Sequence, residues 1–182
     1  MTILLFFISF TSYSAELKLE PVYGVERTQR EFPKPARYKT STFLGMRALY
    51  GVPAISFELE LNQSTSKEDF ADDNLSVTYI DQKALIGFRS YPVHSEYVGL
   101  FFRFGARAQK NKREIVENDV QRNEEDPLRF DPYAGTGLTL AAGKAFALNM
   151  GATLVYNRNA ENEAEKYDTR YSFSFTIRAG NK

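Results

Sequence analysis

The strongest constraint on the fold of this chain is an alternation of apolar and polar residues with a period of two. In the segment ISFELELN, residues 55–62, every odd-numbered residue is large and apolar and every even-numbered residue is polar. This spacing puts successive side chains on opposite faces of a β-strand. The pattern occurs in eight segments: 17–26, 38–50, 55–62, 83–89, 98–109, 134–140, 146–156 and 170–178. The sequence therefore predicts an all-β fold of eight strands.

The connections between these segments alternate in length. Short ones fall at residues 52–53, 92–96 and 143–145, and long polar ones are expected at Arg27–Arg37, Gln63–Asn74, Lys110–Arg129 and Asn157–Lys166. Tight turns at one end and long loops at the other are typical of an antiparallel up-and-down β-barrel whose ends face different compartments. Residues 75–81, before the fourth segment, are ambiguous enough to accommodate a β-bulge.

Glycine indicates which face of the strands is inside. Nine of the 11 glycines share the parity of the charged residues: Gly24, Gly45, Gly51, Gly87, Gly99, Gly105, Gly135, Gly137 and Gly151. The interior of an eight-stranded barrel is just wide enough for side chains to fill, so small residues must alternate with long ones there. We therefore place the charged, glycine-rich face in the lumen and the apolar face against lipid. A soluble carrier with its apolar face inward is the alternative that this parity disfavours.

Composition excludes several function classes. Lys plus Arg and Asp plus Glu both number 23, so the formal net charge is zero and no general nucleic-acid binding is expected. The chain has no cysteine and one histidine, which excludes a disulfide framework, a thiolate or two-histidine metal site, and a cysteine nucleophile. No run of about 18 apolar residues predicts a membrane-spanning helix. We predict no metal and no cofactor.

The first residues have the pattern of an export signal. Residues 3–10 read ILLFFISF, which has the length of a secretory h-region and is too short to span a bilayer as a helix. Cleavage after Ser14 is favoured over cleavage after Ala15, because the latter puts the bulky Tyr13 where a small residue is needed. We expect a signal peptide over residues 1–14 and a barrel domain over residues 15–182, with a buried N-terminal strand as the alternative. Export without cysteine favours a bacterial envelope.

In its overall plan the chain resembles the small eight-stranded outer-membrane β-barrels of the OmpA and OmpX type. The likeness covers residues 15–182 and rests on architecture: an export signal, eight alternating segments, short turns and long loops. The resemblance implies a monomeric, antiparallel, up-and-down transmembrane barrel in a bacterial outer membrane. Both termini would then lie on the periplasmic side.

The charged residues of the inward face are expected to form ion pairs that fill the lumen. The charged residues of that face are Lys18, Glu20, Glu26, Lys39, Arg47, Glu58, Glu60, Lys83, Arg89, Arg103, Arg107, Arg170 and Arg178. The expected members of the network among them are Lys18, Glu20, Arg47, Glu58, Glu60, Arg89, Arg103, Arg107 and Arg178. Buried charges must be paired, because their desolvation is costly. An ion path or an anion pocket is the alternative. A two-residue turn at Val52 and Pro53 would put Arg47 directly opposite Glu58.

The long polar connections carry a group of basic residues at the loop end of the predicted barrel. The group comprises Arg27, Arg30, Lys34, Arg37, Lys110, Lys112 and Arg113. Because Arg and Lys bind phosphates by charge-assisted hydrogen bonds, these residues are candidate contacts to lipopolysaccharide, and ordinary solvated charge is the alternative. The connection over residues 110–129 is expected to project as a hairpin or to hold a short helix. Its length makes it the main candidate for binding a partner.

The sequence offers little support for catalysis. His94, Ser95 and Glu96 are residue types of a nucleophilic triad, but consecutive residues on an extended chain cannot easily form that geometry. The acidic cluster at residues 69–74 lacks the spacing and the central glycine of a calcium loop. We therefore predict no catalytic residue.

The functional expectation is a structural or surface-interaction role, in membrane integrity or in adhesion and recognition through the long loops. The expected partners are outer-membrane lipids, lipopolysaccharide and a host or cell-surface ligand. A narrow small-solute or ion channel is the first alternative, favoured if the lumen charges are not mutually satisfied. A lipid-modifying outer-membrane enzyme is the second.

Overall fold

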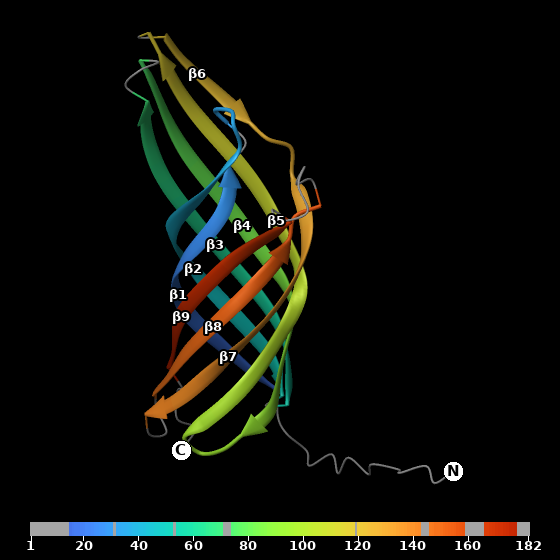
Figure 1. Cartoon of the computed structure of the whole chain (residues 1–182). Coiled ribbons are helices and arrows are strands. Elements are labelled where there is room, and N and C mark those ends of the chain that lie inside the picture. The colour runs from blue at the N-terminus through green and yellow to red at the C-terminus, as the bar shows by residue number, and fades with distance from the viewer. Residues whose placement is uncertain are drawn as a thin grey trace, which may run out of the picture.

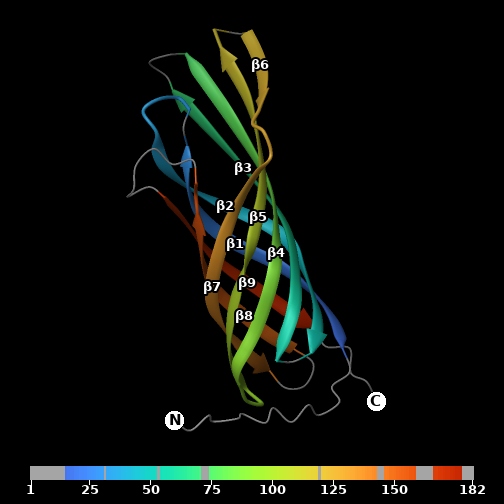
Figure 2. The ribbon, with the colours of Figure 1, turned by 90° about the vertical axis from the view of Figure 1, so that its right-hand side faces the viewer.

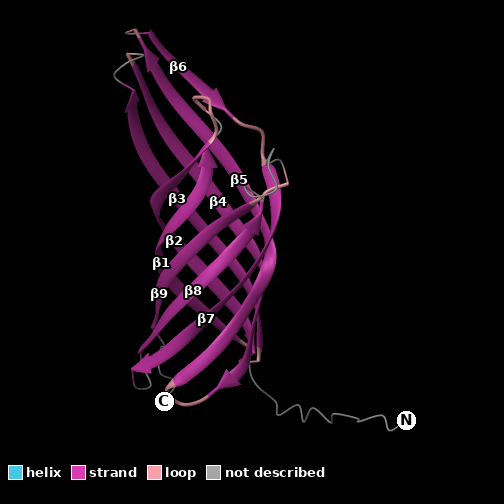
Figure 3. Cartoon of the chain, in the orientation of Figure 1, coloured by secondary structure: helices cyan, strands magenta, loops and turns pink. Residues whose placement is uncertain are grey.

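In a computed structural model the chain forms a closed antiparallel β-barrel (Figure 1). The structure describes residues 15–30, 32–52, 54–70, 74–118, 120–142, 146–158 and 166–177. The predicted signal peptide at residues 1–14 and the predicted network residue Arg178 lie outside these residues. Over the described residues, no helix has the length and apolar character needed to cross a membrane. The described secondary structure consists of strands and turns (Figure 3).

Eight strand positions make up the barrel wall. The strands are β1 (Glu16–Arg30), β2 (Arg37–Val52), β3 (Ile55–Phe70), β4 (Leu75–His94), β5 (Val98–Glu117), β6 (Val120–Glu125), β7 (Arg129–Ala142), β8 (Phe146–Tyr156) and β9 (Tyr167–Ile177). Pairing of β1 with β9 and of β4 with β5 closes the sheet. The upper part of β5 pairs with β6 and its lower part pairs with β7, so these two strands share one position. The predicted eight-stranded up-and-down barrel is confirmed.

Burial alternates along the strands with the predicted parity. On β3, Glu58 and Glu60 are fully buried, whereas the neighbouring Leu61 is 55% exposed. The exposed apolar residues form a band around the barrel, which includes Leu17, Leu19, Tyr23, Leu44, Met46, Tyr50, Phe57, Leu61, Ile86, Phe88, Phe102, Phe104, Phe130, Leu138, Leu154, Phe173 and Phe175. We call this surface the apolar band. The charged face therefore lies in the lumen, as the glycine parity predicted.

Glycines make room for the few large rings inside the barrel. A Cβ atom added to Gly137 would lie 2.3 Å from Cζ of Phe101, and one added to Gly24 would lie 2.4 Å from Cζ of Phe43. Both rings are buried. Small residues thus face large ones across the lumen, which is how an eight-stranded barrel fills its interior.

Two of the four predicted loop segments are mainly strand instead. β3 continues to Phe70, β4 begins at Leu75 and β5 continues to Glu117, so the expectation of long loops at residues 63–74 and 110–129 is wrong. Residues 64–70, 75–82 and 110–117, together with β6, form a four-stranded sheet that projects above the barrel (Figures 1 and 2). We call this sheet the extension. The hairpin alternative for residues 110–129 is confirmed and the helix alternative is not.

The extension reverses the faces that are apolar and polar in the barrel. Its inner face buries Leu75, Val77, Tyr79 and Ile115, against which Phe32 and Phe70 pack. The register between β4 and β5 runs without a shift from residue 75 to residue 90 and changes only between residues 90 and 93. The expected bulge at residues 75–81 is therefore wrong. The pattern is ambiguous there because apolar side chains point outward along the barrel but inward along the extension.

We predict that Gly87→Val prevents a stable barrel, whereas Ala84→Val on the outer face of the same strand does not. A Cβ at Gly87 would lie 2.1 Å from the Phe104 carbonyl oxygen and 2.9 Å from Cα of Gly105, both backbone atoms that cannot rotate away. Overpacking of this kind costs about 1–3 kcal/mol or more. Denaturant unfolding in detergent, with a gel that separates folded from boiled protein, measures the loss. Equal stability of the two variants would contradict the close strand approach at this glycine.

Candidate functional site: the charged lumen and the cavity above it

The lumen holds equal numbers of buried acidic and basic side chains. Among the described residues, seven buried acids face seven buried bases: Glu20, Glu26, Glu58, Glu60, Asp81, Asp131 and Asp168, and Arg30, Arg47, Lys83, Arg89, Arg103, Arg107 and Arg170. Each of these side chains makes at least one ion pair with a member of the other set. The interior is thus electrically neutral, which is the condition under which charges tolerate removal from water.

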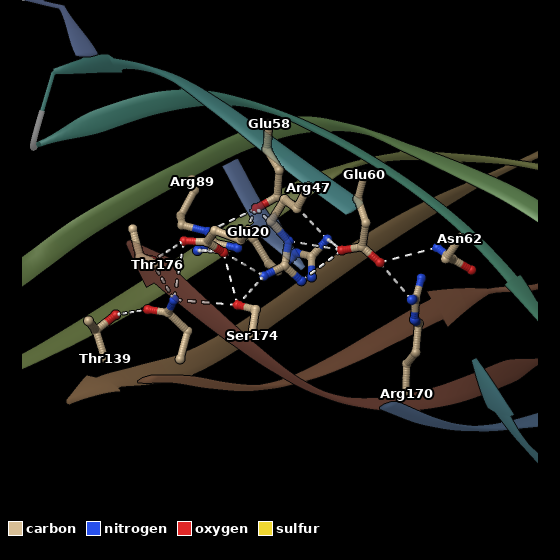
Figure 4. Close-up of polar contacts among 12 residues, drawn as sticks. Glu20, Arg47, Glu58, Glu60, Asn62, Arg89, Thr139, Arg170, Ser174 and Thr176 are labelled. Atoms are coloured by element: carbon tan, nitrogen blue, oxygen red, sulfur yellow. Dashed lines mark hydrogen bonds and ion pairs between the residues drawn. The ribbon is translucent and has the colours of Figure 1, made fainter. Parts of the chain in front are cut away.

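Glu60 on β3 binds three arginines of this network (Figure 4). Its Oε2 atom accepts hydrogen bonds from Nη2 of Arg47 at 2.7 Å and Nη2 of Arg103 at 3.2 Å. Its Oε1 atom accepts from Nη2 of Arg170 at 2.6 Å and from Nδ2 of Asn62 at 3.1 Å. One carboxylate therefore ties β3 to β2, β5 and β9 across the lumen.

Glu20 and Glu58 extend the network toward the end of the barrel that holds the short turns. Nη2 of Arg89 lies 2.7 Å from Oε2 of Glu58. Nη1 of the same arginine lies 3.7 Å from Oε2 of Glu20. Glu20 also accepts hydrogen bonds from Ser174 at 2.9 Å and Thr176 at 2.6 Å (Figure 4). These bonds link the first strand to the last and help to hold the barrel closed.

A second group of ion pairs lies nearer the extension. Arg107 donates to Oδ2 of Asp131 at 2.9 Å and to Oδ2 of Asp168 at 2.8 Å. Above it, Arg30 binds both oxygens of Asp81, at 2.9 and 2.8 Å. A bidentate guanidinium–carboxylate pair is both strong and directional. It closes the upper end of the network.

Aromatic rings support four of the buried guanidinium groups. Cζ of Arg170 lies 3.9 Å from the ring centre of Phe43, and Cζ of Arg89 lies 4.4 Å from that of Phe101. Cζ of Arg103 lies 5.2 Å from the ring centre of Tyr133, and Cζ of Arg30 lies 4.4 Å from that of Tyr79. Such cation–π contacts favour the charged form of a desolvated arginine. The rings that the glycines admit therefore also position the bases of the network.

The predicted network and the structure differ at two described residues. Arg47 pairs across β2 and β3 with Glu60, not with Glu58, because Val52 pairs with Ile55, whereas the expected register pairs Gly51 with Ala54. Glu58 still lies 3.9 Å from Nε of Arg47. Lys18, which is 28% exposed, pairs with Glu16 at 3.1 Å and not with the lumen charges.

Several network residues do not appear in the predicted set. They are Glu26, Arg30, Asp81, Lys83, Asp131, Asp168 and Arg170. Glu26, Lys83 and Arg170 are expected on the inward face from their parity, although they are not among the named members of the network. Asp81 and Arg30 lie in segments interpreted as loop or as ambiguous, where parity was not applied.

The basic residues expected to contact lipopolysaccharide have different surroundings. Arg30 is a correction, because its guanidinium is 5% exposed and bound to Asp81 inside the barrel. Two of the others are exposed: Arg27, which lies over the ring of Tyr38, and Lys34. The remaining four form ion pairs with acidic side chains. Arg37 pairs with Glu68, Lys110 and Lys112 pair with Glu125, and Arg113 pairs with Asp126. Hydrogen bonds from Lys110 and Lys112 lower the pKa of Glu125 to about 2.

A cavity of about 1000 Å³ lies above the ion pairs, where the extension leaves the barrel. Its lining residues are Thr28, Gln29, Arg30, Phe32, Lys34, Pro35, Ala36, Tyr79, Gln109, Asn111, Arg113, Asp126, Pro127, Leu128, Arg129 and Asp168. The turn at residues 32–36 forms one wall, and the connection between β6 and β7 forms another. We call this space the mouth cavity.

The candidate catalytic residues form a turn. The hydroxyl of Ser95 donates to the Val98 carbonyl at 2.8 Å and accepts from the Val98 amide at 3.0 Å, and the His94 ring contacts Tyr91. Within the described part of the chain, no group of three or more His, Cys, Asp or Glu residues is arranged to hold a metal ion.

No protein-family model and no curated protein matches the sequence. Solved structures match the fold. The chain is similar to Ail, the attachment invasion locus protein of Yersinia pestis, with a TM-score of 0.57 at 11% identity over 91% of this chain and 98% of that one. The structure of Ail in complex with the heparin analogue sucrose octasulfate matches with a TM-score of 0.58 at 12% identity, over 89% of this chain and 98% of that one.

Two further barrels show the same likeness. Neisserial surface protein A matches with a TM-score of 0.56 at 11% identity over 90% of this chain and 98% of that one. The outer membrane protein OprG from Pseudomonas aeruginosa matches with a TM-score of 0.51 at 9% identity, over 91% of this chain and 94% of that one. At these identities the shared property is the fold, which is that of the small eight-stranded outer-membrane β-barrels.

We predict that Glu60→Gln destabilises the barrel by about 3–5 kcal/mol, the cost of leaving a buried ion pair without its partner. The change removes the charge that Arg47, Arg103 and Arg170 share and keeps the shape of the side chain. Denaturant unfolding in detergent measures the loss in free energy of unfolding.

Glu117→Gln is the matched control. Glu117 lies 3.7 Å from Arg122 on the extension and is half exposed, so its removal is expected to cost about 0–1 kcal/mol. If the two variants lost equal stability, Glu60 would not be a centre of the network. A double-mutant cycle should also give stronger coupling between Arg47 and Glu60 than between Arg47 and Glu58.

Proposed function

We propose that the protein is an integral barrel of a bacterial outer membrane that acts in surface recognition through its extension. The observation that carries this proposal is the contrast between the two parts of the chain. The lumen is neutral and filled with paired side chains, whereas the extension offers a polar outer face, unpaired strand edges and a cavity. Binding chemistry is therefore available above the barrel and not through it.

The apolar band supports the membrane location. On β5 the outward-facing residues from Val98 to Ala108 are all apolar, and Lys110 and Lys112 follow them. A strand that crosses a bilayer at a tilt needs about 9–11 residues. In water this surface would be a large unburied apolar patch, so contact with lipid is the stable arrangement.

The extension has two sheet edges that could accept a partner strand. β3 pairs with β2 only as far as Gln63, and beyond that point its described residues pair with β4 alone. β6 pairs with β5 alone among the described strands. Unpaired N–H and C=O groups along such edges bind an added strand by main-chain hydrogen bonds.

Adhesion or recognition is preferred to a purely structural role in membrane integrity. A barrel needs only its membrane-spanning part for integrity, yet four strands here continue beyond the apolar band with an apolar core of their own. The fold is shared with proteins named for attachment and invasion and for the cell surface. The partner is proposed to be a host or cell-surface ligand, with lipids and lipopolysaccharide around the barrel and the protein acting as a monomer.

A prediction follows for the hairpin at the top of the extension. Replacement of residues 116–121 by Asn-Gly joins Ile115 to Arg122, which already face each other, through a two-residue turn. Bacteria carrying the full chain should attach to cultured epithelial cells or to immobilised heparin, and this variant should reduce attachment several-fold. The same Asn-Gly replacement at residues 53–54, at the opposite end, should leave attachment unchanged.

The comparison of the two turn variants requires that both still fold. Both must therefore migrate as folded protein on an unboiled gel. Undiminished attachment of the residue 116–121 variant, with the barrel intact, would remove the basis for recognition through the extension.

We also predict that the purified protein shows no large, stable conductance in planar bilayers. The channel alternative requires lumen charges without partners, and the seven bases and seven acids are mutually paired. A barrel of eight strands leaves room for side chains only, whereas water-filled porins have about 16. Steady openings on the scale of a porin would instead establish the channel.

A further inference from the structure

We propose that the mouth cavity is a binding site for a short carbohydrate of one to three sugar rings. The inference rests on the proposed function in one respect, because that function places this end of the barrel outside the cell. The chemistry of the cavity wall, its rings and its size carry the argument.

One wall of the mouth cavity is a chain of polar side chains that already hold one another in place. On the inner face of β5, Nε2 of Gln109 donates to Oδ1 of Asn111 at 2.6 Å. Nδ2 of Asn111 and Nη2 of Arg113 donate to the two carboxylate oxygens of Asp126, at 3.3 and 2.6 Å. The Asp126 amide also donates to the Asn111 carbonyl at 2.9 Å. A ligand therefore meets polar groups whose positions are fixed before it binds, which lowers the entropic cost of binding.

The composition of this wall favours hydroxyl groups over a bare anion. The arginines of the lining are already bound to carboxylates, Arg30 to Asp81, Arg113 to Asp126 and Arg129 to Asp131. An anion would also meet the carboxylates of Asp126 and Asp168 in the same lining. A sugar hydroxyl donates and accepts at once, so it can bond a carboxylate or amide oxygen and an amide or guanidinium N–H side by side.

Aromatic rings also line the cavity. Phe32 lies in the turn at residues 32–36, and Tyr79 is next to Arg113 across β4 and β5. Tyr79 is 2% exposed and its hydroxyl donates to the Phe32 carbonyl, so Phe32 offers the open ring. Arg113 lies over the Phe32 ring with its Cζ 5.7 Å from the ring centre, and Nη1 of Arg37 donates to the Pro33 carbonyl at 3.0 Å. The turn is thus anchored at both ends. Apolar C–H faces of a sugar ring can pack on such aromatic surfaces while its hydroxyls face the polar wall.

The size of the mouth cavity fits this class of ligand. Its volume of about 1000 Å³ is at the upper end of the range of about 300–1,000 Å³ found for small-molecule sites. The exposed residues Lys34, Pro35, Ala36, Pro127 and Leu128 form its rim, so the cavity is reached from the upper end. Its floor is formed by charges of the lumen network, Arg30 bound to Asp81 and Asp168 bound to Arg107.

The test is saturation-transfer NMR on the purified full chain in lipid nanodiscs. The probes are glucose, galactose, N-acetylglucosamine, glucuronic acid, maltose and lactose. We expect saturable transfer to at least one of them. Ala36→Trp, which fills the cavity from its rim without removing a polar partner, should weaken that binding at least tenfold. Ala54→Trp, the same change at an exposed position of the opposite end, should leave it unchanged.

A second variant keeps the proposal falsifiable if the loop rearranges around the tryptophan. Asn111→Leu removes the middle of the polar wall and should also weaken sugar binding at least tenfold, while both proteins still migrate as folded barrels. No transfer to any of the six sugars, or transfer that neither variant changes, would overturn the assignment.

The outcome is separable from that of the proposed function. The variant at residues 116–121 changes no residue that lines the mouth cavity, so it should bind sugar like the full chain. Attachment that depends on the hairpin, without sugar binding, would remove only the carbohydrate site. Sugar binding without hairpin-dependent attachment would keep the site and remove the proposed function.

Discussion

The desolvation of charged side chains in a narrow, closed lumen is the constraint on which the rest of this structure depends. Each buried carboxylate must meet enough guanidinium or ammonium groups to replace its lost water. Glu60 meets three arginines from three different strands, and Glu20 joins the first strand to the last. The ion pairs therefore do more than fill space, because the contacts that neutralise the lumen are the same contacts that fix the strands around it.

A filled, neutral lumen moves the functional surface to the end of the barrel. The apolar band is occupied by lipid in the proposed membrane setting, and each of the buried lumen charges that the structure describes is already in an ion pair. The extension is different, since its inner face carries its own apolar cluster and its two outer strands have open edges. The mouth cavity lies at the junction of the two parts, where polar wall residues of β5 meet the ring of Phe32.

The junction also explains where sequence reasoning failed. Below it, apolar residues of β4 such as Ile86 point outward, and above it Val77 and Tyr79 point inward, although the strand continues without a shift in register. In the proposed membrane setting the surroundings change here from lipid to water, and this change reverses which face must be hidden. Polar outward residues in the upper strands then resemble loop composition, which is why strands were expected to end too early and Arg30 was expected to be exposed.

The sequence by itself determined the number of strand positions in the wall, through the count of alternating segments, and the faces that are charged and apolar, through parity along each strand. Only the tertiary structure decided which charges meet. Moving a two-residue turn by one position shifts the pairing by two residues and preserves parity, so Glu58 and Glu60 were equally compatible with Arg47 until closure selected Glu60. Closure also brought Ser174 to Arg47, 127 residues apart in the chain, at 3.1 Å. Parity is a local property, whereas register and closure depend on contacts between strands distant in sequence.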